Sequence, residues 1–210
     1  MSRGSLWHWT VGAPAPGLRR ARQLSALSVR QQNRTMVEYR PAEPSDADAI
    51  AFLHTRSWRE NYRGALPDAF LDGDLPDERL RVWRKTLDHP PESQFVQVAV
   101  DGANLVGFVC AYGAHDPQCG SFVDNLHVAN TAKNTGIGSS LMRQAGDWLA
   151  RLYPDLGVYL WVLETNSSAR RFYERLGAQN AGVSTMETHG SAVVRSCRYT
   201  WPRAELLCAA

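Results

Sequence analysis

A segment of residues 126–141 combines two glycines with a complete absence of acidic side chains. Gly136 and Gly138 allow the backbone to approach a ligand closely, and the residues that follow predict the start of a helix. The free N–H groups and the dipole at a helix N-terminus attract anions, and Lys133 adds a positive charge. Because residues 125–146 contain no Asp or Glu, an anion would meet no repulsion there. The segment predicts a phosphate-binding loop.

Two other nucleotide-binding motifs do not fit this loop. The pattern G-x-x-x-x-G-K-[ST] of a Walker loop does not occur, and the run from Gly136 to Leu141 lacks the third glycine of a dinucleotide fingerprint. Neither a kinase nor a dehydrogenase is indicated. An ordinary strand-to-helix turn, which glycine also favours, stays open as the alternative on these residues alone.

A second pair of polar residues stands at helical spacing further along the chain. Asn166 and Tyr173 are seven residues apart, which is close to two turns of an α-helix, so both side chains lie on nearly the same helical face. Both can therefore contact one ligand. The alternative is that Asn166 is only a helix cap and that Tyr173 only belongs to the core.

Taken together, the two segments resemble the signature of the GNAT superfamily of N-acetyltransferases. Leu126-x-Val128 followed by Lys133-x-x-Gly136-x-Gly138 is similar to the family's strand and Gln/Arg-x-x-Gly-x-Gly/Ala loop, with lysine in place of the usual Gln or Arg. Lysine keeps a hydrogen-bond donor at this position but changes its geometry.

The second block of the family is matched more closely. It consists of a strand, an Asn, an Ala, a Phe-Tyr pair and a Gly, and the corresponding residues are Asn166, Ala169, Phe172, Tyr173 and Gly177. The resemblance covers residues 37 to 201.

The resemblance implies that acetyl-CoA is the cosubstrate and that the first loop wraps its pyrophosphate. The residues expected to bind it are Leu126, His127, Val128, Lys133, Asn134, Thr135, Gly136, Ile137, Gly138, Ser139, Asn166 and Tyr173. The resemblance also implies direct transfer of the acetyl group to a primary amine of a small molecule or a protein.

Direct transfer requires three groups. The backbone N–H of Val128 is expected to stabilise the oxyanion, and Tyr173 to protonate the leaving thiolate. Asp124 is the candidate base, because alternation along a strand places it on the face of Leu126 and Val128, whereas His127 is expected to point to the other face. Glu60 and Glu164 stay open as alternative bases.

Hydrophobic periodicity and turn residues predict the elements that position these groups. The order is β-α-α-β-β-β-α-β-α-β-β, with strands expected over residues 37–40, 95–100, 105–112, 121–128 and 158–163 and two more within 181–201. Helices are expected after residue 46, over 77–87, from 137 to 152 and over 167–176. The prediction is an α/β (α+β) fold with one mixed, mostly antiparallel sheet and flanking helices.

Charge divides the chain into parts. Residues 1–35 hold six arginines and no acid, which leaves 17 basic and 21 acidic residues, a net charge of −4, for residues 36–210. We interpret 1–35 as a disordered extension, 36–203 as the acetyltransferase domain and 204–210 as a C-terminal tail. An arginine-rich leader also fits a transit peptide or a nucleic-acid arm, but the domain lacks a basic, aromatic-interleaved pattern, so we predict no nucleic-acid partner.

Composition predicts a cytoplasmic protein with no metal and no membrane span. The four cysteines form no C-x-x-C pair and the six histidines no ligand spacing, while the longest apolar stretch is far shorter than the roughly 20 residues of a membrane helix.

The amine acceptor is not identified by any motif. The mild acidity of the domain favours a cationic acceptor. Trp58, Tyr62 and Trp161 are expected to be core residues rather than acceptor ligands. A homodimer through the last strands is a hypothesis that the resemblance raises. A non-catalytic coenzyme A sensor on the same fold is the alternative function.

Overall fold

The computed structural model describes residues 36–188 and 192–207, and the expected disorder of residues 1–35 lies outside these ranges. Within the described residues, seven strands form one sheet in the order β1-β2-β3-β4-β5-β7-β6. Only β4 and β5 pair in parallel, and all other neighbours are antiparallel. The predicted α/β fold with a mixed, mostly antiparallel sheet is confirmed.

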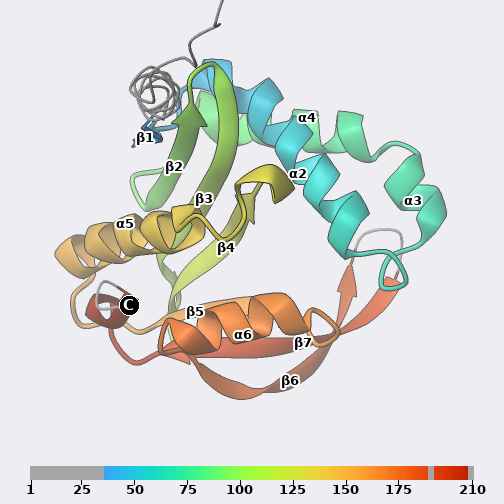
Figure 1. Ribbon diagram of the computed structural model, residues 1–210. Helices are drawn as coiled ribbons and strands as arrows, with labels where there is room; N and C mark the ends of the chain where they lie inside the picture. Colours follow the sequence, from blue (N-terminus) through green and yellow to red (C-terminus); the bar gives the residue numbers. More distant parts are fainter. Residues whose placement is uncertain (1–35, 189–191, 208–210) are drawn as a thin grey trace, which may run out of the picture. The chain divides into compact units, whose positions relative to one another are not determined.

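Helices cover both faces of this sheet (Figure 1). The strands are β1 (Glu38–Pro41), β2 (Gln94–Asp101), β3 (Asn104–Asp116), β4 (Gly120–Val128), β5 (Val158–Leu163), β6 (Gln179–Thr188) and β7 (Ala192–Trp201). The helices are α2 (Ala47–Asn61), α3 (Asp68–Asp72), α4 (Leu75–Asp88), α5 (Ile137–Leu152) and α6 (Ser167–Arg175), with short 3-10 turns η1 (Pro44–Asp46), η2 (Asn130–Ala132) and η4 (Ala204–Leu207).

Alternation along the strands separates two cores. Val109 and Ala111 of β3 face α5 and α6, whereas Phe108 and Cys110 face α2 and α4. This follows from the two-residue period of a strand, because the run from Leu105 to Tyr112 is apolar on both sides and needs helices on both faces.

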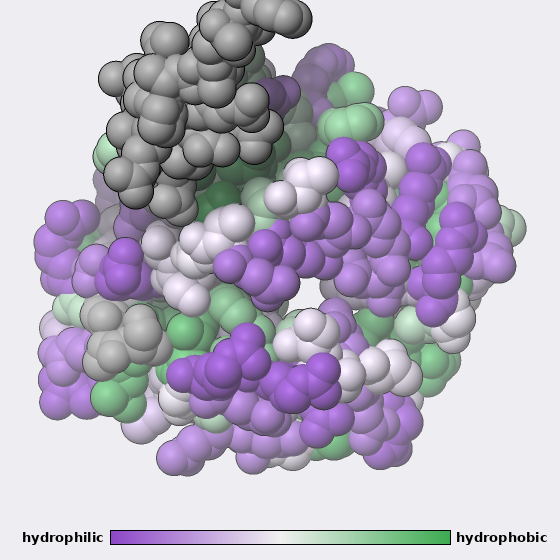
Figure 2. All heavy atoms as spheres, in the orientation of Figure 1, coloured by the Kyte–Doolittle hydropathy of each residue, from purple (hydrophilic) through white to green (hydrophobic). Residues whose placement is uncertain are grey.

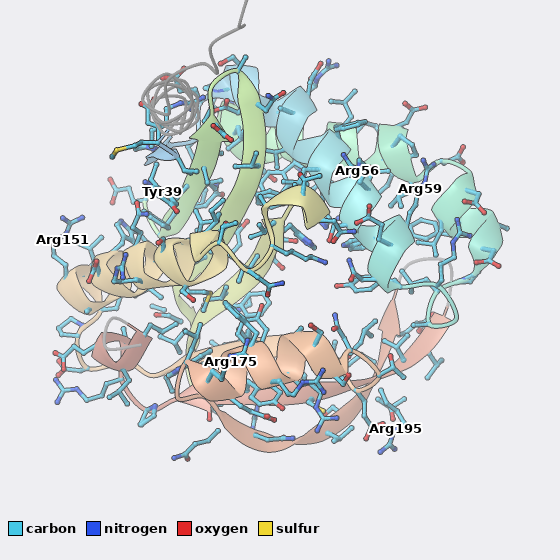
Figure 3. All side chains as sticks on the ribbon, in the orientation of Figure 1. Tyr39, Arg56, Arg59, Arg151, Arg175 and Arg195 are labelled. Carbon is cyan, nitrogen blue, oxygen red and sulfur yellow. The ribbon has the colours of Figure 1, made fainter. Side chains whose placement is uncertain are left out.

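Helix α3 was not predicted, because residues 61–67 were interpreted as a simple break between two helices. It is held by long-range contacts: the Leu71 side chain is fully buried, and the Arg59 Nε donates to the Leu71 carbonyl at 2.7 Å. Figure 3 labels Arg59 on α2, the helix next to α3. Helix α4 begins at Leu75, two residues before its expected start.

Strands β4 and β5 are neighbours over only a short distance. Their paired residues are Ser121 with Val158 and Phe122 with Tyr159. Beyond this point a register shift in the β3–β4 pairing leaves Asp124 without a partner, between Val123 and Asn125. Such a bulge bends a strand and increases its twist. The two strands therefore separate toward their C-terminal ends, which creates an opening in the sheet.

Residues 204–207 pack into the core although they lie beyond the expected domain end at residue 203, and residues 208–210 lie outside the described ranges. Helix η4 buries Ala204 and Leu207, each 1% exposed, in the cluster that contains Leu149 of α5 and Trp201 of β7. Sequence pattern missed this because four residues are too few to show a helical period.

This packing makes a stability prediction with a neighbouring control. Leu207→Ala removes a fully buried side chain and is expected to lower the free energy of unfolding by about 2–5 kcal/mol. Leu206→Ala, at a side chain that is 45% exposed, is expected to change it by less than about 0.5 kcal/mol. Urea unfolding of the full chain measures both, and equal effects would show that η4 is not part of the core.

Candidate active site

The opening between β4 and β5 leads into a cavity of about 620 Å³. Figure 2 shows the surface hollowed at this place, between the α2 side and the α6 side. Helices α2, α4 and α6, strands β3, β4 and β5 and the loop before α5 all contribute to its wall. Of the residues selected from sequence, those that line it are Asp124, Leu126, His127, Val128, Lys133, Asn134, Gly136, Gly138, Ser139, Asn166 and Tyr173.

The loop before α5 has the backbone geometry of an anion site. Gly136 is the N-cap of α5 and has a φ of 88°, a left-handed conformation that glycine adopts without strain. The first backbone hydrogen bond that closes a helical turn runs from Ser140 N–H to the Gly136 carbonyl at 3.0 Å. The N–H groups of Ile137, Gly138 and Ser139 precede it and are the unsatisfied donors of the first turn. Free N–H groups at a helix N-terminus are the geometry of an anion cradle.

Two residues of the predicted set support the loop without lining the cavity. The Thr135 hydroxyl donates to the Ala132 carbonyl at 2.7 Å. Ile137 is the first residue of α5, and its side chain is buried in the core. A β-carbon added at Gly138 would lie 3.3 Å from the Phe172 ring of α6. The N-terminus of α5 therefore packs directly against α6.

Asn166 and Tyr173 lie on one wall, as their spacing predicts. The Asn166 Oδ1 accepts a hydrogen bond from the Ala169 N–H at 3.1 Å, so this residue is also the N-cap of α6. Tyr173 is 8% exposed and packs beside Phe172, Tyr199 and Trp201. Burial, with a smaller contribution from Tyr62, raises the pKa of the Tyr173 phenol.

Asp124 lies on the opposite wall, but not on the strand face that alternation predicted. The bulge inserts one residue, so Leu126 and Val128 pack toward α5 while Asp124 is close enough to Arg79 of α4 for that charge to affect its pKa. The Asn125 amide donates to Asp124 Oδ2 at 2.6 Å. Burial raises the pKa of the Asp124 carboxyl, and the charges of Arg79 and His115 offset this in part.

The other two carboxylates considered as bases lie outside the cavity. Glu60 accepts from the Asn130 amide at 2.7 Å and is 3.6 Å from Arg56, and Glu164 pairs with Arg195 at 2.6 Å. Figure 3 labels Arg56 on α2 and Arg195 near β7, on different elements from the β4 wall. Among the described residues that line the cavity, Asp124 is the only carboxylate.

His127 is packed against α2. Its Nδ1 lies 2.7 Å from the Ser57 hydroxyl, and its ring centroid is 4.5 Å from that of His54. Burial first, and then the charges of Arg79 and Lys133, lower the pKa of His127 to about 3. The imidazole is therefore neutral at ordinary pH and lines the cavity as an uncharged polar group.

Trp58 belongs to a buried core cluster, as expected, and Tyr62 packs against that cluster, but the aromatic residues assigned to the core also line the cavity. Trp58, Tyr62 and Trp161 all contribute to its wall, and Trp58 is at the same time 8% exposed. The spacing of residues on two helices could have indicated the cavity wall from the sequence. The residues facing the cavity follow the i, i+3, i+4, i+7 pattern on each: His54, Ser57, Trp58 and Asn61 on α2, and Arg79, Val82, Trp83 and Thr86 on α4.

The edge of β4 presents backbone donors to the opening. Ala129 N–H donates to the Val106 carbonyl at 2.8 Å, and alternate residues of an antiparallel strand bond to the same neighbour. The N–H groups of Leu126 and Val128 therefore point away from β3, toward the side from which β5 has separated.

No three His, Cys, Asp or Glu side chains gather at a possible metal site in the ranges that the structure describes. No helix of those ranges is long and apolar enough to cross a membrane.

An open sheet with a parallel β4–β5 pair and an anion cradle at the N-terminus of α5 defines an acyl-CoA N-acyltransferase fold. The family model described as Acetyltransferase (GNAT) family matches residues 49–178. The chain therefore belongs to the GNAT family of acetyltransferases.

Relatives of known name and structure agree with this. The probable N-acetyltransferase Rv2775 of Mycobacterium tuberculosis is 29% identical over 145 residues, which is 66% of this chain and 78% of that protein. The PaiA N-acetyltransferase of Thermoplasma acidophilum, solved with coenzyme A, superposes with a TM-score of 0.58 at 17% identity, over 77% of this chain and 98% of that one. NAA60 of Arabidopsis thaliana, solved with acetyl-CoA, gives a TM-score of 0.60 at 18% identity, over 79% and 98%.

The low pKa of His127 predicts a pH dependence of stability. In the unfolded chain a histidine binds a proton near pH 6.5, whereas folded His127 binds it only near pH 3. Stability is therefore fully present above pH 6.5 and falls as the pH drops from there toward 3, by up to about 1.4 kcal/mol per pH unit for one proton.

Denaturant unfolding between pH 6.5 and 5, above the ordinary range of carboxyl groups, isolates this effect. His127→Gln is expected to remove up to that slope relative to the native chain. His89→Gln, at a side chain that is 89% exposed, is expected to leave the slope unchanged. An unaltered slope in His127→Gln would contradict the burial of the neutral imidazole.

Proposed function

We propose that the protein transfers the acetyl group of acetyl-CoA directly to a primary amine of a small molecule or a protein. The single observation that carries the proposal is the shared cavity: the anion cradle of α5, Tyr173 of α6 and Asp124 of β4 all line it. Membership of the GNAT family supports the reaction class, and the coenzyme A complex of the PaiA relative supports the cosubstrate.

The pyrophosphate of the cosubstrate is assigned to the N-terminus of α5. Its oxygens accept from the N–H groups of Ile137, Gly138 and Ser139, where a helix dipole contributes about 0.3–2 kcal/mol for an anion. Lys133 of the loop and Arg175 of α6, both on the cavity wall, supply positive charge. Figure 3 labels Arg175 on α6.

The thioester lies in the opening between β4 and β5. As the amine nitrogen attacks, a carbon–nitrogen bond forms and the carbonyl oxygen becomes an oxyanion. The Val128 N–H is directed into this opening and donates to the oxyanion, a contribution of about 3–4 kcal/mol to the transition state in a site closed to water. The carbon–sulfur bond then breaks and coenzyme A leaves.

Proton transfer is divided between two walls. Asp124 accepts a proton from the ammonium group before attack, and Tyr173 gives its proton to the leaving thiolate. The second amine proton, released as the amide forms, restores the phenol through solvent. The raised pKa values support both roles, because the shift keeps Tyr173 protonated before turnover and makes Asp124 a stronger base than a carboxylate of ordinary pKa.

Replacing the phenol separates binding from chemistry. Tyr173→Phe is expected to lower kcat about 10²–10⁴-fold, with the dissociation constant of acetyl-CoA changed less than about threefold, because the ring stays in the core and only the proton donor is lost. Thiol release by the full chain with a panel of amines measures kcat, and calorimetry measures binding. Tyr39→Phe, on β1 at the edge of the sheet, is the matched control and is expected to keep full activity.

Either of two outcomes would overturn the enzyme assignment. If acetyl-CoA binds but no amine stimulates thiol release, the chain is a coenzyme A sensor. If acetyl-CoA does not bind, the anion cradle at α5 has been assigned wrongly.

The role of Asp124 predicts a pH profile. A base acts only when deprotonated, so kcat/KM is expected to rise with pH through a pKa above the ordinary carboxyl value of 3.8. Asp124→Asn is expected to lower kcat/KM at least about 100-fold at neutral pH and to remove this limb. Glu60→Gln, outside the cavity, is the control. If kcat/KM of Asp124→Asn still rises with pH over the same range, another group is the base.

A further inference from the structure

The acceptor half of the cavity carries little charge. Lys133 and Arg175 belong to the phosphate end, so among the described residues that line the cavity Arg79 is the one other charged side chain beside Asp124. Arg79 is 6% exposed, forms an ion pair with Glu78 and lies 4.7 Å over the Trp58 ring. A ligand with several positive charges would therefore meet one carboxylate and one cation.

Aromatic side chains form most of the remaining surface of this half. They come from four different parts of the chain: Trp58 of α2 with Tyr62 directly after that helix, Trp83 of α4, Tyr112 of β3 and Trp161 of β5. Flat rings on several sides suit an apolar or aromatic ligand body. They also attract an ammonium group through their negative faces before it is deprotonated.

The aromatic surface continues out of the cavity along the sheet. Tyr112 of β3, Phe122 of β4 and Tyr159 of β5 are paired in register across three adjacent strands, so their side chains share one face. The Phe122 and Tyr159 rings stack at 4.9 Å, and His115 lies 5.0 Å from Phe122 with its Nδ1 2.8 Å from the Tyr159 hydroxyl.

This row is joined to the cavity at two points. Tyr112 belongs to both the row and the cavity wall, and Trp161, two residues after Tyr159 on the same face of β5, lines the cavity as well. Tyr112, Phe122 and Trp161 are half-buried. A ligand whose amine reaches Asp124 can therefore rest its remaining atoms on a continuous aromatic floor.

We propose that the acceptor is a small monoamine whose amino group is carried on an aromatic or other flat apolar body. The proposal rests on the transfer reaction proposed above. The net charge of the domain favours a cationic acceptor in general, and the cavity wall limits this class further. Asp124 can accept one amine, no second carboxylate lines the described wall for a further positive charge, and the aromatic rings contact the rest of the acceptor.

The test compares acceptors that each carry a primary amine and differ in the rest of the molecule. Using the full chain with saturating acetyl-CoA, kcat/KM is measured for phenethylamine and tryptamine, for spermidine, and for a lysine-containing hexapeptide. The aromatic monoamines are expected to exceed spermidine and the peptide at least about tenfold. Equal or higher values for spermidine or the peptide would overturn this proposal and leave the acetyltransferase assignment intact. No turnover with any amine would overturn the acetyltransferase assignment itself.

Two variants test the structural basis. Trp161→Ala is expected to raise the KM for phenethylamine at least about tenfold while the KM for acetyl-CoA changes less than about twofold. Phe52→Ala removes a ring that is 64% exposed outside the cavity and is expected to change neither value. An unchanged amine KM in Trp161→Ala would contradict the aromatic floor.

A third variant is expected to gain activity, and misfolding cannot explain a gain. Val82 of α4 is 38% exposed and lines the cavity, so Val82→Glu adds a second carboxylate to its wall. This variant is expected to raise kcat/KM for spermidine at least about fivefold and to lower it for phenethylamine. No gain with spermidine in a folded variant would show that charge at this wall does not select the acceptor.

Discussion

The separation of β4 from β5 is the constraint on which the rest of the site depends. Two strands that paired along their whole length would satisfy each other's backbone groups and close the sheet. Here the parallel pairing is limited to Ser121–Val158 and Phe122–Tyr159, and the bulge at Asp124 turns β4 away. The same bend exposes the edge of β4, opens the cavity and brings Asp124 to its wall. One inserted residue thus determines three properties of the site.

Local patterns in the sequence predicted the parts of the site that lie on one element. The turn at Gly136, the free donors of α5 and the shared face of Asn166 and Tyr173 all follow from helix geometry over fewer than ten residues. The order and the approximate bounds of the strands followed from their two-residue period. Strand β5 was predicted over the residues that it occupies, Val158–Leu163.

The parts that depend on contacts between distant segments were not predictable in this way. Simple alternation assigned Asp124 to the wrong face because a bulge is a property of the β3–β4 pair and not of β4 alone. Helix α3 is stabilised by Leu71 and Arg59, and η4 by the core beneath α5. Trp58 and Tyr62 were expected in the core but also line the cavity, because a helical stripe looks the same whether it faces a core or a cavity.

Burial gives the site its chemical character. It raises the pKa of both Tyr173 and Asp124 and lowers that of His127, so all three groups are displaced toward their neutral forms.

The contact between Gly138 and Phe172 couples the N-terminus of α5 to helix α6. The glycine lies in the first turn of α5, at the proposed phosphate site, and the phenylalanine precedes Tyr173 on α6. A β-carbon at position 138 would lie 3.3 Å from the phenyl ring. A methyl group at position 138 would have to push the phenyl ring, and the ring's own helix carries the phenol. A side chain at position 138 would thus require Phe172, the neighbour of the proposed proton donor, to shift by a few tenths of an ångström, so Gly138 and Phe172 would need to be redesigned as a pair.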